Sequence, residues 1–286
     1  MATLGKIKRR IESVKSTQQI TKAMKMVAAA KLRKAQEQLA ATRPYTHELF
    51  NVIGKLAAQP IAHDHPCFVK KTTTHICYVL VTADRGLCGS FNTHLINQAE
   101  KTLMTREADK VSLLTIGKMG YNHFRRQADA SVVGKYVDFF QKLSFEHAVK
   151  IADALISAFE KNRFDSIVVI HNDFQSIARQ QITVAPFLPI EPIHATATTP
   201  VTTVFEPHPL KMLDKLLRTS LHYDMYRILL ESFTAEQSAR MTAMETASDN
   251  AEEMIKTLVL YYNKARQAAI TTELNEIVGG AEALKG

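Results

Sequence analysis

The residues whose types are most suited to catalysis or ligand binding lie in Asp84–Gly89, which reads DRGLCG. The segment follows an apolar, strand-like run and precedes a helical stretch, where ligand loops form in open α/β sheets. Two glycines three residues apart are weak support for a small-molecule or thiol site, so a tight strand-to-helix turn is the favoured interpretation. A nucleophilic Cys88 would need a histidine base, and His94 would point elsewhere from a helix. We expect Asp84 and Arg85 to pair or to cap the next helix rather than to catalyse.

Other candidate chemistry is weaker still. His63, His65 and Cys67 lie close together as a metal clip would, but no fourth ligand is in view, which favours a polar loop. The three cysteines are an odd number without metal-type spacing, which predicts a reducing compartment. Neither GxxxxGK[ST] nor GxGxxG occurs, so the usual phosphate-binding loops are missing. The sequence therefore predicts no catalytic residue, no cofactor and no metal.

Charge is placed unevenly along the 286 residues. Residues 1–57 carry 12 Lys and Arg against 3 Asp and Glu, residues 58–208 carry 15 against 14, and residues 209–286 carry 9 against 11. The net charge of +8 therefore lies on the first segment. Such a segment is typical of nucleic-acid binding, but no aromatic residue precedes Tyr45 to stack on bases, and an acidic partner surface fits equally. No apolar run approaches a membrane span, and no secretory signal follows the basic start.

Two long windows favour unbroken helix. Neither Gly nor Pro occurs between Gly5 and Pro44, or from Leu210 to Val278. The first helix would be about 75–80 Å long if it continues to Leu56, and the second about 100 Å or more. Neither length fits inside a compact domain.

An apolar repeat of 3.5 residues runs through both windows and predicts a left-handed coiled coil. In the first helix it comprises Leu4, Ile7, Ile11, Val14, Gln18, Thr21, Lys25, Ala28, Leu32, Ala35, Leu39, Thr42, Thr46, Leu49, Ile53 and Leu56. In the second it comprises Met212, Leu216, Thr219, Tyr223, Tyr226, Leu230, Phe233, Gln237, Arg240, Met244, Ala247, Ala251, Met254, Leu258, Tyr261, Ala265 and Ala268. The first repeat turns polar at Gln18, Thr21 and Lys25, while Ile20, Met24 and Val27 form a second stripe that predicts a further binding partner.

The middle of the chain alternates strands and helices, which indicates a parallel α/β sheet. The expected strands are His75–Thr82, Lys110–Ile116 and Phe164–Asn172, and the expected helices are Phe91–Arg106, the segment KMGYNHFRRQ and Phe145–Lys161. Gln180–Phe205 is expected to be an edge strand and a linker. The predicted organisation is a Rossmann-like α/β domain of residues 58–208 between two coiled-coil helices, residues 1–57 and 209–286.

Connectivity predicts that the two helices pair antiparallel, because both leave the same α/β domain. If Leu56 lies beside Met212, paired residue numbers sum to about 268, and everything beyond about Ala265 lacks a partner within the chain. The unpaired segment still carries one apolar stripe, which marks an interface. Its members are Ile270, Leu274, Ile277, Ala281 and Leu284. The same register places Gln18–Lys25 opposite Ala243–Asn250, so the polar positions coincide where a third body would touch the helices.

Four segments of the sequence closely resemble the gamma-subunit family of F-type ATP synthases. They are ITKAMKMVAAAKLRKAQ, TADRGLCGSFN, ARMTAMETASDNAEEMI and YNKARQAAITTELNEIVGGAEAL. The resemblance implies a central rotor shaft that penetrates a ring of three alpha and three beta subunits. The α/β domain would contact the epsilon subunit and the membrane ring of c subunits, and proton flow would turn the shaft. ATP and Mg²⁺ would bind on alpha and beta.

The resemblance also implies partner-binding residues. Met24 and Lys25 fall in the segment that faces the lever of the beta subunits, and Arg240 matches the arginine of the ARMxAM motif. The remaining matches contact the sleeve and the catch loop of the ring, and they are Arg266, Gln267, Thr271 and Glu276. The sequence departs from commoner family members at Lys25, often Glu, at Ser238, often Ala, and at Glu245, often Lys.

The start in helix, without a transit peptide, favours a bacterial protein at the cytoplasmic face of the inner membrane, peripheral through its complex. Two other function classes stay open. A basic coiled-coil scaffold or nucleic-acid-binding protein would bind DNA or RNA with a steep salt dependence. A small α/β enzyme with helical arms would bind a ligand at Gly86–Gly89.

Overall fold

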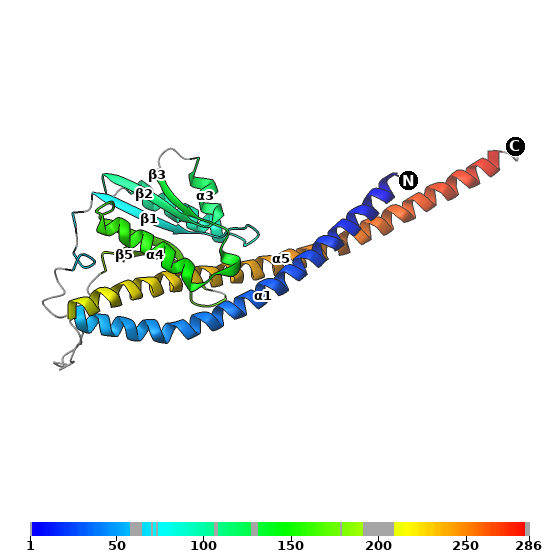
Figure 1. The fold of residues 1–286 in the computed structure, drawn as a ribbon. Coiled ribbons are helices and arrows are strands. Elements are labelled where there is room, and N and C mark those ends of the chain that lie inside the picture. Colours follow the sequence, from blue (N-terminus) through cyan, green and yellow to red (C-terminus); the bar gives the residue numbers. More distant parts are fainter. Residues whose placement is uncertain are drawn as a thin grey trace. The chain divides into compact units, whose positions relative to one another are not determined.

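The computed structural model describes residues 2–57, 65–69, 71–72, 74–105, 108–126, 131–177, 179–190 and 209–283. Its elements are α1 (Ala2–Ala57), β1 (His75–Val81), α2 (Phe91–Met104), β2 (Lys110–Ile116), α3 (Lys118–Phe124), β3 (Ser131–Tyr136), η2 (Phe140–Lys142), α4 (Phe145–Glu160), β4 (Ser166–Phe174), β5 (Gln180–Leu188) and α5 (Pro209–Ala283) (Figure 1). The chain divides into two compact units. The helical unit is Met1–Ala29 with Arg240–Gly286, and the α/β unit is Ala30–Ala239.

The sheet of the α/β unit has the strand order β3-β2-β1-β4-β5. β1, β2, β3 and β4 run parallel to one another, and β5 pairs antiparallel with β4. The predicted class, a mostly parallel α/β sheet with two long helices, is confirmed. β5 forms one edge, as predicted, whereas the predicted linker after residue 190 lies outside the described residues.

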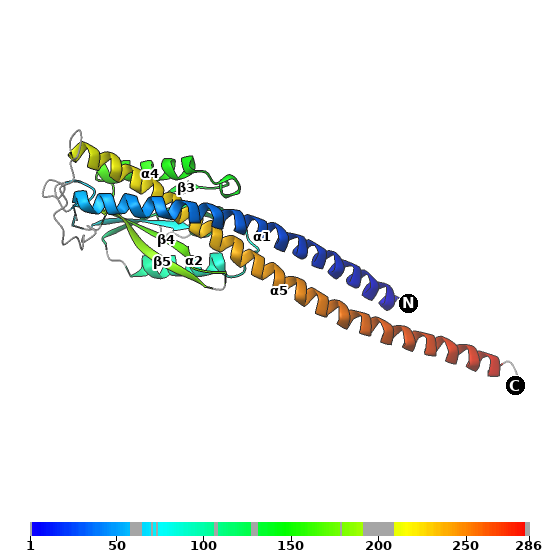
Figure 2. The ribbon, with the colours of Figure 1, turned by 90° about the horizontal axis from the view of Figure 1, so that it is seen from below.

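The opposite edge strand, β3, was not predicted. It reads SVVGKY, contains Gly134 and has no fully buried residue, because one of its sides has no neighbouring strand. A half-exposed edge strand lacks the continuous apolar run by which β1 and β4 were identified. β1 owes its nearly complete burial to helices on both faces of the sheet. Figure 2 shows α4 on one side of the sheet and α2 on the other.

The two long helices run antiparallel within each unit (Figures 1 and 2). The seam predicted for α1 is its covered face, because every described side chain of that repeat is buried or half-buried. In the α/β unit the rings of Tyr45 and Tyr223 lie 4.4 Å apart, and in the helical unit Lys25 Nζ lies 2.6 Å from Glu245 Oε1. These residue numbers sum to 268 and 270, so the predicted register is confirmed.

The seam predicted for α5 needs a correction in both units. Met254 and Tyr261 belong to that seam but are exposed, whereas the residues that follow them, Ile255 and Tyr262, are half-buried, so at these positions of the helical unit the covered face lies one residue further along α5. Leu213, Leu217 and Leu221 lie outside it but are fully buried, because in the α/β unit this part of α5 also packs into the core formed by the sheet and α4. A single heptad stripe describes a helix with one neighbour, and in the α/β unit α5 has more than one.

Candidate functional site

The seven partner-binding residues predicted from the family resemblance all lie in the helical unit. Met24, Lys25 and Arg240 are half-buried. Four more, from the second half of α5, are exposed, and they are Arg266, Gln267, Thr271 and Glu276. The predicted site is therefore a surface along two helices rather than a pocket for a small molecule.

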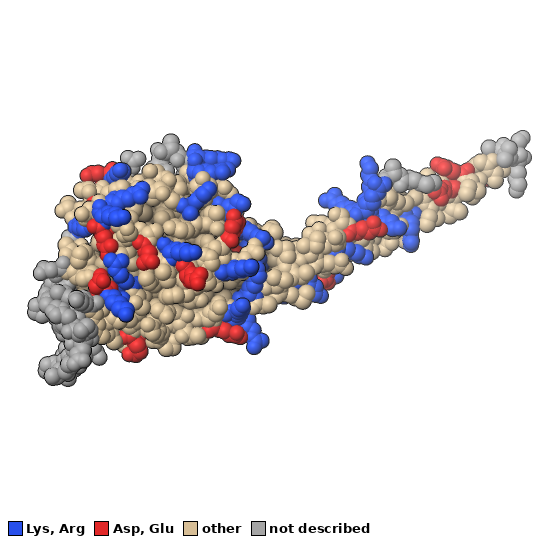
Figure 3. Space-filling view, in the orientation of Figure 1, with Lys and Arg blue, Asp and Glu red and all other residues tan. Residues whose placement is uncertain are grey.

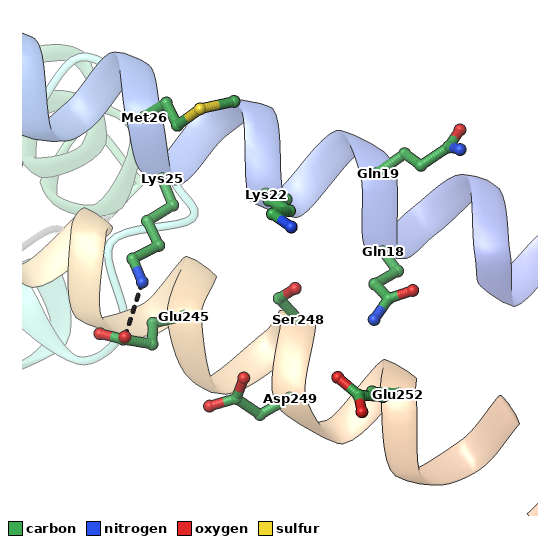
Figure 4. A pocket seen from close by; sticks show the side chains of 9 residues that line it. All are labelled: Gln18, Gln19, Lys22, Lys25, Met26, Glu245, Ser248, Asp249 and Glu252. Carbon is green, nitrogen blue, oxygen red and sulfur yellow. Dashed lines mark hydrogen bonds and ion pairs between the residues drawn. The ribbon is translucent and has the colours of Figure 1, made fainter. Parts of the chain in front are cut away.

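A polar hollow of about 400 Å³ opens between α1 and α5 of this unit. Lysines and amides come from α1 and carboxylates from α5, as Figure 4 shows. The lining residues are Gln18, Gln19, Lys22, Lys25, Met26, Glu245, Ser248, Asp249 and Glu252. The predicted coincidence of polar positions, residues 18–25 opposite residues 243–250, is confirmed. Large apolar side chains that would close the seam are replaced here by polar ones, which leaves room for water or for a partner's side chains.

Lys25 and Glu245 form an ion pair of 2.6 Å across this hollow, with 38% and 49% of their side chains exposed. Water screens such a pair, so it contributes only about 0.2–1 kcal/mol to stability. Two of the three departures from commoner family members therefore contact each other. Sequence reasoning treated them separately, although their opposite charges and their register position were a usable signal.

The third departure, Ser238, lies in the α/β unit. Its hydroxyl donates a hydrogen bond of 3.1 Å to the backbone carbonyl of Ile177, between β4 and β5. An alanine could not make this bond. A contact within the chain thus explains why this position can carry a serine instead of the commoner alanine.

A second ion pair, on α5, lies at the far end of the hollow. Glu252 Oε1 accepts from Lys256 Nζ at 2.9 Å, one helical turn away. The hydrogen bond and the charge of Lys256 lower the pKa of Glu252, and Glu252 in turn raises the pKa of Lys256. Both side chains are exposed, so this pair contributes little to stability, and its main effect is on the local distribution of charge.

The last described turns of α5 are uncovered. Every described side chain from residue 270 to residue 282 is exposed. Leu274 and Ile277 expose 56% and 67% of their surface, and Ile270 and Val278 are similar. Thr271 donates its hydroxyl proton to the backbone carbonyl of Gln267 at 3.0 Å, so this hydroxyl offers a partner mainly its oxygen lone pairs. The predicted absence of an intramolecular partner beyond about Ala265 is confirmed over residues 270–282.

Charge differs between the two helices of the helical unit. Residues 1–29 carry seven Lys and Arg against one acidic residue, whereas residues 240–286 carry five against seven. On the face shown in Figure 3, Lys and Arg gather along the α1 end of the unit, and acidic side chains appear near the end of α5. A partner that surrounds the unit therefore meets a basic side and a weakly acidic one.

The Asp84–Gly89 loop is a tight strand-to-helix turn, as the favoured interpretation held. Leu87 and Gly89 have positive φ values of 63° and 58°. Cys88 is buried, and its sulfur accepts a hydrogen bond of 3.2 Å from the Asn92 amide, not from the exposed His94. The side chain of Asp84 accepts a bond of 3.1 Å from the backbone N–H of Lys118, the first residue of α3. The capped helix is therefore α3 rather than the next one along the chain.

The candidate metal clip finds no support. His63 lies outside the described residues, and His65 approaches Asp214 at 3.7 Å. Burial raises the pKa of the Cys67 thiol to about 11, which disfavours the thiolate that binds metals. Over the chain as described, no three His, Cys, Asp or Glu side chains gather as metal ligands would. In the same residues, no helix combines the length and the apolar character needed to cross a membrane.

Comparison with known proteins gives one consistent family. The profile of the family described as ATP synthase matches residues 3–284. ATP synthase gamma chains of Geotalea daltonii and of Geobacter sp. strain M21 are 43% and 45% identical to this chain, over the whole of both sequences. The gamma chain of Prosthecochloris aestuarii is 42% identical over the same full extent.

Solved structures share the fold at lower identity. A chain of the Euglena gracilis mitochondrial ATP synthase, from a structure of its OSCP, F1 and c-ring, matches with a TM-score of 0.70 and 20% identity, covering 99% of this chain and 95% of that one. A chain from the central stalk and c-ring of the Tetrahymena thermophila mitochondrial ATP synthase matches with a TM-score of 0.63 and 22% identity, covering 80% of this chain and 99% of that one.

Proposed function

The chain belongs to the ATP synthase gamma-chain family, and from this premise we propose that it is the central-stalk rotor of a proton-translocating F-type ATP synthase. A gamma chain is a non-catalytic subunit of its complex, so its contribution is mechanical. Rotation of a c ring would turn this chain, and the turning chain would drive the catalytic beta subunits through their binding changes in sequence.

One observation carries the proposal: residues 270–282 of α5 are exposed, yet they include four large apolar side chains. An apolar stripe of this kind marks an interface. We propose that a ring of three alpha and three beta subunits encloses it, with Arg266, Gln267, Thr271 and Glu276 as contacts. Arg266 and Gln267 precede the apolar residues, and Thr271 and Glu276 lie between them, so the polar contacts would let the ring slide past without one deep minimum.

The polar hollow has a matching role in the proposal. Lys25, which lines the hollow, would face the lever segments of the beta subunits together with Met24 and Arg240, which do not line it. Because Lys25 is already paired with Glu245, the lever would meet a nearly neutralised pair rather than a free lysine. Weak, screened contacts suit a surface that has to meet three successive beta subunits.

The remaining partners and the location follow from the same proposal. We propose the three-part division into residues 1–57, 58–208 and 209–286, with the α/β domain contacting epsilon and the c ring. The complex would lie at the cytoplasmic face of a bacterial inner membrane, and the chain would be peripheral to the membrane through its partners.

Co-expression with alpha and beta subunits tests the proposal. Size-exclusion chromatography should recover one copy of this chain with three alpha and three beta subunits. A control truncated after Ala265 should assemble poorly or fail to couple ATP hydrolysis to proton pumping. Recovery of the full chain alone, with salt-steep binding to DNA or RNA, would instead favour the nucleic-acid alternative.

A further inference from the structure

A run of buried polar side chains lies in the middle of α5, within the α/β unit. Each member exposes 5% of its surface or less. They are Glu231, Ser232, Thr234, Glu236, Gln237 and Ser238. Burying polar groups beside an apolar core costs free energy unless each is hydrogen-bonded, so their partners determine what the run does.

Two members of the run contact the β4–β5 hairpin, about sixty residues away in the sequence. Ser238 Oγ donates to the carbonyl oxygen of Ile177 at 3.1 Å. Glu231 Oε2 lies 3.6 Å from Nε2 of His171, a buried residue of β4. These contacts join α5 to both β4 and the turn that follows it.

Glu231 is held in its charged form. Burial by itself would raise its pKa, but the contact with His171 and the charge of Arg227 outweigh this, and the net pKa lies below the ordinary value. Arg227 donates to Glu231 Oε2 at 2.8 Å and to Asp224 Oδ1 at 2.7 Å, both on α5 itself. The carboxylate at the contact with β4 is therefore oriented by its own helix, through Arg227.

Most of the remaining interface is apolar. Leu213, Leu217, Met225, Ile228 and Leu229 of α5 belong to one core with the strands and α4. Apolar burial is non-directional, so by itself it specifies the rotational angle of the helix less sharply than a hydrogen bond does. A hydrogen bond weakens steeply once its angle falls below about 120°, so it resists the same rotation.

We propose that the contacts Ser238–Ile177 and Glu231–His171 form a register lock, which holds the β4–β5 hairpin at one angle on α5 so that sheet and helix turn together. The inference rests on the proposed rotor function, because transmitting load through this contact matters only if the chain carries torque. Ser238, Glu231 and His171 are then positioning residues that transmit load and touch no partner subunit.

The test compares two serine-to-alanine variants in the assembled, membrane-reconstituted enzyme. Ser238→Ala removes the bond to the hairpin. Ser220→Ala is the matched control, because Ser220 is equally buried on α5 but donates to Leu217 of the same helix at 2.7 Å. The readout is ATP-driven proton pumping divided by ATP hydrolysis, measured while the opposing proton gradient is increased.

Ser238→Ala should lower this ratio about two- to tenfold at high gradient, as the loss of one hydrogen bond predicts, with hydrolysis at zero gradient unchanged. Ser238→Thr, which keeps the hydroxyl, should restore most of the ratio, and Ser220→Ala should match the parent. Equal ratios for the two alanine variants, or no rescue by threonine, would overturn the lock.

A second measurement separates the lock from the proposed function. In the purified full chain, Ser238→Ala should speed amide hydrogen exchange in the β4–β5 turn, and Ser220→Ala should not. Unchanged exchange in the turn would also overturn the lock. If the parent enzyme fails to couple while exchange in the turn responds to Ser238→Ala, the rotor proposal fails and the contact itself stands.

Discussion

Two stretches of one helix, α5, differ in how far their side chains are buried. Residues 213–238 are buried or half-buried except at two positions, whereas residues 270–282 are exposed throughout. Both stretches nevertheless contain regularly spaced large apolar residues. Apolar spacing thus shows that a helix has an interface, but it does not show whether the partner is in the same chain.

The first stretch packs against other elements of the same chain, whereas the second is uncovered over the described residues. Leu217 is fully buried among side chains of the sheet and α4. Leu274 is 56% exposed. If the chain is a rotor, the first leucine stabilises the fold and the second serves assembly.

The largest expected effect sharpens this contrast directly. Leu217→Ala should lower the free energy of unfolding by about 2–5 kcal/mol, because it leaves a cavity in a packed core. Leu274→Ala should change it by no more than about 0.5 kcal/mol, because the side chain is mostly exposed. Denaturant unfolding of the purified chain measures both, and equal losses would remove the distinction between the stretches.

The next effect concerns the buried charge at Glu231. Glu231→Gln should cost about 1–3 kcal/mol at neutral pH, because it weakens the hydrogen bond that Glu231 accepts from the charged Arg227. The folded-state pKa of Glu231 lies below its ordinary 4.5, so this stabilisation is present above pH 4.5 and is lost as the pH falls through the folded value. The difference between parent and variant should therefore shrink in acid, and a difference that stays constant with pH would contradict the charged assignment.

A smaller effect is expected between the two stretches, at Leu258. It is half-buried, and the register places it beside Ile11 of α1. Leu258→Ala should cost about 1–2 kcal/mol, roughly half the value for the fully buried Leu217. Met254→Ala is the control, because Met254 is exposed. A loss as large as that of Leu217→Ala would mean that α5 has a second neighbour here too.

The smallest effect belongs to the ion pair of the hollow. Lys25→Glu and Glu245→Lys should each cost about 0.2–1 kcal/mol, and the double variant should recover most of the loss because the pair is re-formed with reversed charges. Thermal unfolding of the four proteins completes the cycle. Strictly additive losses would show that the pair does not contribute in solution.

Local pattern was enough to predict four strands, the two long helices and their register. Runs such as HICYVLV identify a strand by composition, and the seam of α1 needs only one neighbour. β3 was missed because an edge strand with Gly134 is only half-buried. The family resemblance, not the pattern, identified the predicted contact residues, and their roles remain predictions.

The buried polar contacts of α5 could not be predicted from local pattern. His171 and Ile177 lie about sixty residues from their partners on α5. A repeat within either segment therefore cannot predict these contacts. A heptad repeat is defined by apolar residues on one face of a helix, so it gives no sign that polar residues such as Glu231 or Ser238 are buried. The Lys25–Glu245 pair differs, because the predicted register and the opposite charges together would have found it.

Amide hydrogen exchange on the free chain and on its complex with alpha and beta subunits tests the central claim most directly. The account predicts that amides of residues 270–282 exchange quickly in the free chain and become strongly protected in the complex, while those of residues 213–238 are protected in both. Slow exchange of residues 270–282 in the free chain, or no gain of protection on assembly, would contradict it.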